Sequence, residues 1–173
     1  MRTAPHPLGL ALLCTLAGCS ALPIALPATG LGAPAPEVEL TDARTGERVE
    51  LADYRGRTVI LNVWATWCGP CRREMPALDA IQAASPDRVV VLFASSESPE
   101  VIRAWMADRP AEGRHLYVAP EALRGPYALA ESMRPVTFLI DADGILRDRV
   151  VGAQTEDVFR QHVEDLQSTR ASL

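Results

Sequence analysis

The sequence contains no lysine, since each of its 17 cationic side chains is an arginine. This absence excludes mechanisms that need a lysine Schiff base or a lysine that clamps a phosphate group, because arginine cannot take either role. A strong charge of either sign is also missing: the net charge is −5, and acidic and basic residues are interspersed. We therefore expect no nucleic-acid partner and no polybasic surface that binds a membrane.

Cysteine is scarce, with four residues in the chain. Cys14 lies in the apolar run 8–16, which follows a weakly positive start and precedes Leu-Ala-Gly-Cys, ending at Cys19. This order predicts an export signal peptide over residues 1–18, and the last four residues resemble a bacterial lipobox, which implies lipidation of Cys19. With Cys14 removed and Cys19 capped by lipid, the exported part has no framework of structural disulfides.

Two other interpretations of the N-terminal segment stay open. The apolar stretch continues to Leu26, which allows an uncleaved membrane-spanning anchor, although Ser20 and Pro23 weaken that interpretation. Ordinary cleavage that releases a soluble protein is the third interpretation. Replacement of Cys19 by alanine separates a lipoprotein from a spanning anchor, because only the lipoprotein would lose its membrane attachment. All three interpretations predict that the domain leaves the cytoplasm.

A lipid anchor and tether over residues 19–35 and a folded domain over residues 36–173 are the predicted organisation of the mature chain. Residues 20–35 hold three prolines, two glycines and no apolar period. After them, strand and helix patterns alternate. The predicted strands cover residues 37–40, 48–51, 58–63, 88–94, 116–118, 136–140 and 145–151. The predicted helices run from the cysteine motif to residue 85 and over residues 98–108, 120–130 and 155–167, and a Gly-Pro step at residues 125–126 interrupts the helix over residues 120–130. This order predicts a mixed central sheet covered by helices.

The motif Cys-Gly-Pro-Cys at residues 68–71 follows a buried strand and begins a helix. A cysteine at a helix N-terminus lies near unpaired backbone N–H groups, which lowers its pKa from about 8.5 to between about 3.5 and 7.5. Cys68 is therefore the expected nucleophile. Cys71 lies one turn deeper, where it can attack a mixed disulfide on Cys68, so it is the expected resolving thiol. Gly69 and Pro70 complete the motif, and Pro70 presets φ for the first turn.

The segment 62–76, Asn-Val-Trp-Ala-Thr-Trp-Cys-Gly-Pro-Cys-Arg-Arg-Glu-Met-Pro, and the segment 135–141, Pro-Val-Thr-Phe-Leu-Ile-Asp, carry a resemblance to a known family. They resemble the TlpA/ResA branch of exported, membrane-tethered thioredoxin-like proteins. The resemblance extends from about residue 36 to the last helix. It implies an α/β thioredoxin fold, with a mixed central sheet flanked by helices and an N-terminal β-hairpin extension.

The resemblance also implies a proton-transferring carboxyl group. Asn62 stands where cytoplasmic thioredoxins carry a buried aspartate, so that acid is absent. Glu74 matches the glutamate that this branch places near the buried thiol. A desolvated carboxylate has a raised pKa, which would let Glu74 take or give a proton as Cys71 attacks or leaves. The alternative is an ordinary glutamate on the helix surface.

The predicted substrate contacts are Trp67, Arg134 and Pro135. Pro135 matches the family's cis-proline, which faces the cysteine pair and offers backbone pairing to an extended substrate. Arg134 departs from the small or apolar residue expected before that proline. A cation near Cys68 would favour the thiolate and make the couple more oxidising. An Arg134→Thr variant with an unchanged Cys68 pKa and reduction potential would contradict this hypothesis.

Other classes of function fit the sequence less well. Structural zinc needs four ligands, whereas the mature chain has one cysteine pair and isolated histidines at His115 and His162. Copper-delivery proteins of this fold space their cysteines one residue further apart. Peroxidases of this fold carry threonine or serine three residues before a single reactive cysteine, a position held here by Ala65. A non-catalytic binding or metal-delivery module is the alternative to an enzyme, although both cysteines are retained.

The sequence thus predicts a thiol-disulfide oxidoreductase that cycles through a redox disulfide between Cys68 and Cys71. Its expected partners are protein thiols and disulfides and an upstream thiol electron donor, and its expected contact with the membrane is the N-terminal anchor. We expect no cofactor, no metal and a monomer. Gly-Pro between the cysteines favours a reductant, and the resemblance implies reduction of apocytochrome c or another exported protein.

Overall fold

The centre of the fold is built from β-branched and apolar residues. The computed structural model describes residues 30–109 and 113–171. Within them, β3 (Thr58–Trp64) and β4 (Val89–Ser95) pair in parallel and are buried along their whole length. Both faces of this pair are therefore covered, which explains the nearly continuous hydrophobic character of the two strands.

One mixed sheet contains the described strands, in the order β2-β1-β5-β4-β3-β6-β7. Parallel pairing joins β3, β4 and β5, whereas each of the remaining strands runs antiparallel to its neighbours. Besides β3 and β4, the strands of the sheet are β1 (Leu40–Asp42), β2 (Arg48–Val49), β5 (Arg114–Val118), β6 (Val136–Ile140) and β7 (Leu146–Val151). The predicted mixed sheet and N-terminal hairpin are confirmed, and the hairpin extends the sheet beyond β5.

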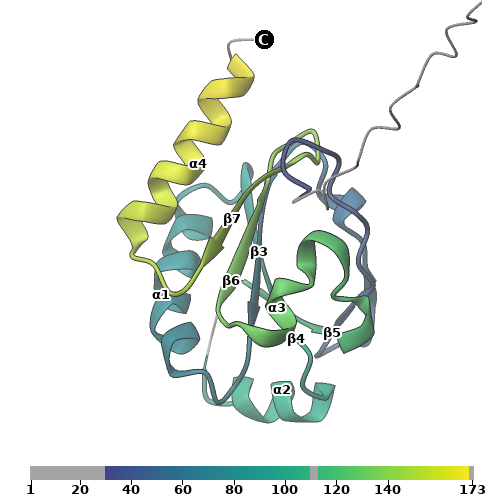
Figure 1. The fold of residues 1–173 in the computed structure, drawn as a ribbon. Coiled ribbons are helices and arrows are strands. Elements are labelled where there is room, and N and C mark those ends of the chain that lie inside the picture. The colour runs from purple at the N-terminus through teal and green to yellow at the C-terminus, as the bar shows by residue number, and fades with distance from the viewer. Residues whose placement is uncertain (1–29, 110–112, 172–173) are drawn as a thin grey trace, which may run out of the picture.

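Helices cover both faces of the sheet. They are α1 (Gly69–Ala84), α2 (Pro99–Met106), α3 (Leu129–Ser132) and α4 (Glu156–Ala171). Figure 1 shows α1 and α4 together on one face and α3 on the other. Side chains of β3 alternate between the two cores: Val59, Leu61 and Val63 face one, and Ile60 and Trp64 face the other, the one that α1 covers.

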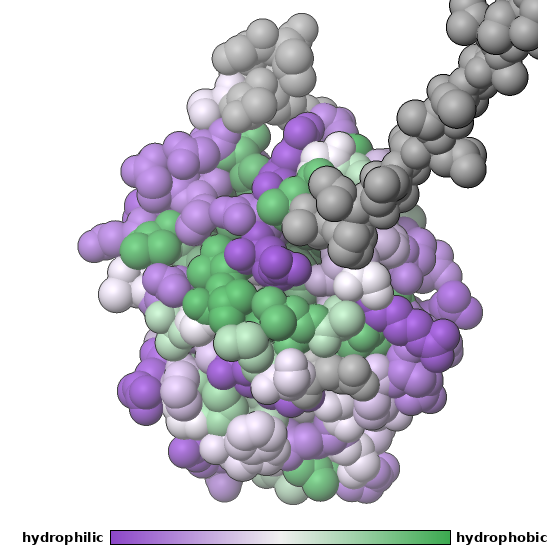
Figure 2. All heavy atoms as spheres, viewed as in Figure 1, coloured by the Kyte–Doolittle hydropathy of each residue, from purple (hydrophilic) through white to green (hydrophobic). Residues whose placement is uncertain are grey.

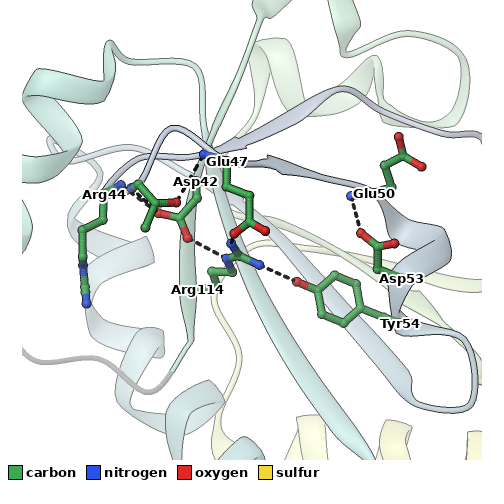
Figure 3. A network of polar contacts seen from close by, with 8 residues as sticks. Asp42, Arg44, Glu47, Glu50, Asp53, Tyr54 and Arg114 are labelled. Atoms are coloured by element: carbon green, nitrogen blue, oxygen red, sulfur yellow. Dashed lines mark hydrogen bonds and ion pairs between the residues drawn. The ribbon is translucent and has the colours of Figure 1, made fainter.

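A polar network joins the hairpin to β5 (Figure 3). Arg114 of β5 donates through Nε to Asp42 at 2.6 Å and through Nη2 to Glu47 at 2.5 Å. Its Nη1 donates to the hydroxyl of Tyr54 at 3.3 Å. Tyr54 belongs to the 3₁₀ turn η1 (Leu51–Tyr54), which forms where the sequence pattern predicts the end of the second strand. A single guanidinium group therefore ties three parts of the N-terminal extension to the sheet.

The predicted interruption of the segment 120–130 at Gly-Pro is confirmed, but the prediction of α-helix on both sides of it is wrong. The structure has two 3₁₀ turns there, η2 (Pro120–Ala122) and η3 (Gly125–Tyr127), followed by the four residues of α3. Gly125 has a φ of +57°, outside the right-handed helical region. Pro126 also lacks the N–H group that a continuous helix would use. Together they divide the segment.

The segment just before the hairpin is also ordered against the sheet. The sequence pattern assigns residues 32–35 to the tether, yet the structure places them along the start of β7. The N–H groups of Gly32 and Ala35 donate to the carbonyl oxygens of Leu146 and Gly144 at 2.8 and 2.9 Å.

Figure 2 shows hydrophobic side chains gathered over β7, and Val151 at the end of this strand is 40% exposed. Among the described residues, no helix has the length and apolar character needed to cross a membrane.

Candidate redox-active site

The two motif cysteines lie at the N-terminus of α1, directly after β3. Cys68 is the N-cap residue, and its Sγ accepts a hydrogen bond from the N–H group of Cys71 at 3.2 Å. The two side chains are joined as a disulfide, with their Cα atoms 5.3 Å apart. Pro70 occupies the first turn, where a missing N–H group costs no helical hydrogen bond. The strand, the loop and the capped helix together bring the pair to one end of the parallel strands.

Both cysteines are buried, but their surroundings differ in exposure. Cys71 is fully buried, and Cys68 is 4% exposed. The neighbouring Trp67, in contrast, is 69% exposed. A substrate can therefore approach the Cys68 side of the disulfide across the Trp67 ring. The first turn of α1 contains no acidic residue, so nothing there offsets the positive end of the helix dipole.

Glu74 lies one helical turn after Cys71 and is 2% exposed, which rules out the helix-surface alternative. Asn62 of β3 donates from Nδ2 to Glu74 Oε1 at 2.9 Å, and the backbone N–H of Gln154 donates to Oε2 at 3.1 Å. Burial raises the pKa of Glu74 to about 7, and the two hydrogen bonds oppose part of that rise. A carboxyl group with this pKa can hold or release a proton near neutral pH.

Asn62 connects Glu74 to the strand that follows the cis-proline. Its Nδ2 also donates to Thr137 Oγ1 of β6 at 2.9 Å. Asn62 Oδ1 is buried and accepts no hydrogen bond from the part of the chain that the structure describes. If the side-chain amide of Asn62 were flipped, its Oδ1 would face Glu74 Oε1 and Thr137 Oγ1. It could then accept a hydrogen bond from a protonated Glu74. The amide can therefore satisfy either protonation state of the carboxyl group.

The predicted substrate contacts Trp67 and Arg134 lie next to each other, and Pro135 follows Arg134 in the chain. The peptide bond between Arg134 and Pro135 is cis, as the family resemblance implies. Arg134 donates from Nη2 to Ser96 Oγ at 2.9 Å, and its Cζ lies 5.9 Å from the centre of the Trp67 ring. The guanidinium group is thereby held over the ring of Trp67, the residue that precedes Cys68.

A carboxylate that the sequence pattern does not identify holds the loop before the cysteines. Glu97 accepts from the backbone N–H of Thr66 at 2.6 Å and from Thr66 Oγ1 at 2.7 Å. Ser95 Oγ adds a third hydrogen bond to this carboxylate at 3.2 Å. No sequence signal links Glu97 or Gln154 to the motif, because their contacts span 31 and 80 residues.

The histidines do not contribute to a metal cluster. In residues 30–109 and 113–171, no three side chains of histidine, cysteine, aspartate or glutamate are arranged to hold a metal ion. His115 is buried among the rings of Trp64, Phe93 and Trp105. His162 Nδ1 lies 3.1 Å from Asp148 on the surface. Cys19, the predicted lipidation site, lies outside the described residues.

Comparison with known proteins identifies the family. The AhpC/TSA family matches residues 31–149, which is more than half of the chain. The chain belongs to the AhpC/TSA family. Among curated relatives, the thioredoxin-like protein YneN of Bacillus subtilis is 32% identical over 136 residues, which is 77% of this chain and 78% of YneN. The thiol-disulfide oxidoreductase ResA of Geobacillus kaustophilus is 30% identical over 141 residues, which is 80% of this chain and 79% of ResA.

Solved structures confirm the thioredoxin fold of this AhpC/TSA-family chain. The exposed lipoprotein thioredoxin of Streptococcus pneumoniae superimposes with a TM-score of 0.67 and 26% identity, over 76% of this chain and all of that one (100%). A thioredoxin-family thiol:disulfide interchange protein of Chlorobium tepidum gives 0.65 and 25% identity, over 77% of this chain and 94% of that one. The chain is a thiol-disulfide oxidoreductase of the thioredoxin superfamily, as the sequence predicts.

Proposed function

We propose that this oxidoreductase acts outside the cytoplasm as a membrane-tethered reductant of protein disulfides, with apocytochrome c as one candidate substrate. The observation that carries the proposed chemistry is a buried carboxyl group, Glu74, one helical turn from a buried cysteine and with its pKa raised to about 7. A reductant of this kind needs a nucleophile that substrates can reach and a resolving thiol that can lose its proton. Cys68 is the nucleophile in this proposal, and Cys71 is the resolving thiol.

The first step joins the substrate to the protein. The Cys68 thiolate attacks one sulfur of a substrate disulfide, so that a mixed disulfide forms and the substrate S–S bond breaks. The other substrate sulfur leaves as a thiolate and takes a proton from water. The helix N-terminus favours the Cys68 thiolate over the thiol, and the open Trp67 side of the pair admits the substrate.

The second step releases the product. Cys71 transfers its proton to the Glu74 carboxylate and attacks Cys68 Sγ, which forms the internal disulfide and expels the second substrate thiolate. The substrate has then gained two electrons and the cysteine pair has lost two. A dithiol donor protein returns the pair to the reduced state by the reverse exchange, and Glu74 gives its proton back to Cys71.

The equilibrium reduction potential of the Cys68–Cys71 couple tests the direction of the reaction. We expect a value well below about −230 mV in titrations of the purified full-length chain against thiol buffers, in the range of reducing thioredoxins near about −270 mV. A value approaching about −120 mV would make the protein an oxidant, with Arg134 as the first cause to examine. The absence of any reversible two-electron couple would contradict the enzymatic role and leave a binding module.

The proposed location rests on the N-terminal sequence and on one relative. Residues 1–18 have the order of an export signal, and the pneumococcal structural relative is an exposed lipoprotein. We expect the chain to be found in the membrane fraction of the host and the Cys19→Ala variant to lose that attachment. A variant that stays in the membrane would support the spanning anchor instead. A soluble parent chain would support ordinary cleavage.

A further inference from the structure

The surface around the nucleophile carries an unusual amount of positive charge. Arg72 and Arg73 follow the resolving cysteine and are exposed on α1, and Arg134 precedes the cis-proline and lies over the Trp67 ring. We call the surface formed by Trp67, Arg72, Arg73 and Arg134 the active-site surface. Within the described ranges 30–109 and 113–171, no salt bridge engages Arg72 or Arg73.

These arginines occupy positions that helix stability does not explain. The N-terminal end of a helix is its positive end, where acidic side chains are favourable and cationic ones unfavourable. The first turn of α1 nevertheless has no acidic residue, and Arg72 and Arg73 follow immediately. Repulsion from the dipole and between neighbouring cations would be relieved by an anion that binds over this end of the helix.

Two of the arginines lie against residues that adjoin Cys68 in the chain. Arg73 Nη1 lies 3.5 Å from the point where a Cβ atom on Gly69 would stand, so its guanidinium group folds back over the motif. Arg134 lies over the Trp67 ring. Glu97, which holds the loop before the cysteines, is half-buried and accepts hydrogen bonds from Thr66 and Ser95, so local donors already engage its carboxylate.

Building on the proposed redox function, we infer that the active-site surface selects extended polypeptides with acidic residues beside the reacting cysteine. The substrate strand would cross the Trp67 ring, with one carboxylate near Arg73 and another near Arg134. Opposite charges of this kind raise the association rate and orient the substrate before the thiolate attacks. Neutral or basic sequences around the same disulfide would react more slowly.

Three peptides that differ only beside an internal disulfide test this inference. Glutamate, glutamine or arginine would flank each cysteine, and the reduced full-length chain would be mixed with each peptide in stopped flow. Two electrons pass from the Cys68–Cys71 pair to the peptide, and the change in tryptophan fluorescence gives the second-order rate constant. We expect the glutamate peptide to react about tenfold faster than the glutamine peptide at low ionic strength. Near 1 M salt, where the screening length is about 3 Å, the ratio should approach one.

Charge variants locate the effect on the protein. Arg73→Gln and Arg134→Gln should each lower the glutamate-to-glutamine ratio about threefold, and Arg73→Glu should bring it below one. Arg48→Gln is the matched control, because it removes the same charge from β2, where Arg48 pairs with Glu50. That control should keep the parent ratio. Arg73 is exposed on a helix, so its variants test the inference even if Arg134→Gln disturbs the cis-proline loop.

The outcomes separate the inference from the proposed function. Equal rates for the three peptides, or a preference that survives high salt or keeps its parent value in Arg73→Gln, would overturn the selection of acidic substrates while leaving the redox function intact. A chain that reduces none of the peptides and no small neutral disulfide would instead contradict the proposed function itself.

Discussion

Two buried carboxyl groups of this protein, Asp42 and Glu74, have opposite electrostatic environments. Asp42 is 8% exposed and Glu74 is 2% exposed, and both accept backbone hydrogen bonds. Asp42 also receives the Arg114 guanidinium at 2.6 Å, and its pKa is lowered because this cation and the hydrogen bonds outweigh burial (Figure 3). Glu74 has the neutral Asn62 in the corresponding place, so burial prevails and its pKa rises to about 7.

The difference shows how one fold uses a buried acid in two ways. A carboxylate with a cationic partner stays ionised over the physiological range and holds the hairpin against β5. A buried carboxyl group with only neutral partners can gain or lose a proton near neutral pH. The partner side chain therefore decides whether a buried acid stays ionised or titrates near neutral pH.

The largest effect is expected from Glu74→Gln. Because folding raises the pKa of Glu74, this group makes its full contribution to the free energy of unfolding below its ordinary pKa of 4.5. The contribution is lost as the pH rises through about 7. The neutral variant should therefore be more stable than the parent at pH 8, by up to about 3 kcal/mol, and should lose this advantage near pH 4. Release of substrate from the mixed disulfide should slow by about 100-fold near neutral pH.

Urea denaturation at the two pH values and single-turnover kinetics measure these two effects. Glu164→Gln, a change of the same type on the exposed surface of α4, should leave both unchanged. A Glu74→Gln variant that resolves the mixed disulfide at the parent rate would remove Glu74 from the proposed mechanism, whatever its stability.

Arg114→Gln should have the next largest effect, because it leaves the Asp42 carboxylate without its cation. Because the Arg114 side chain is 33% exposed, we expect the free energy of unfolding to fall by about 2 to 3 kcal/mol. This loss is smaller than the usual cost of breaking a fully buried ion pair. The urea midpoint at pH 7 reports this loss. Arg48→Gln removes an exposed charge of the same hairpin and should shift stability by less than about 0.5 kcal/mol. Equal effects of the two variants would contradict the clamping role of Arg114.

His115→Phe extends the comparison to a buried base with no hydrogen-bonding partner. Neither ring nitrogen of His115 is hydrogen-bonded within the described residues, and burial lowers its pKa from 6.5 to about 4, with Arg44 adding to the drop and Asp42 opposing it. The neutral ring makes its full contribution to the free energy of unfolding above pH 6.5, and this contribution is lost as the pH falls through about 4. The effect of the phenylalanine substitution on the free energy of unfolding should therefore be about 2 kcal/mol more favourable at pH 5 than at pH 8. The same shift at both pH values would contradict this.

The smallest effect is expected from Thr137→Val. This variant removes the acceptor of one Asn62 hydrogen bond but keeps the shape of the side chain and the bond to Glu74. We expect a loss of about 1 kcal/mol at pH 7 and little change in the pH at which Glu74 titrates. A large shift of that titration, followed by NMR of the Glu74 carboxyl carbon, would show that Thr137 takes part in setting the pKa.

The cysteine chemistry was predictable because its parts are adjacent in the chain. Cys68, Cys71 and Glu74 lie within two helical turns, and the local sequence orders them along α1. The family resemblance added the cis peptide bond before Pro135, which no local pattern indicates. The Gly-Pro step at residues 125–126 indicated that the helix over residues 120–130 is interrupted, but the local sequence did not indicate that two 3₁₀ turns and a four-residue helix take its place.

The sequence by itself determined the strand pattern, the capped helix that presents Cys68 and the class of reaction, since each depends on residues that are neighbours in the chain. Only the tertiary structure decided which carboxyl groups are paired with a cation. Asp42 and Arg114 are 72 residues apart, and Gln154 reaches Glu74 over 80 residues. A pKa depends on burial and on charges within a few ångströms, and the packing of distant elements creates both.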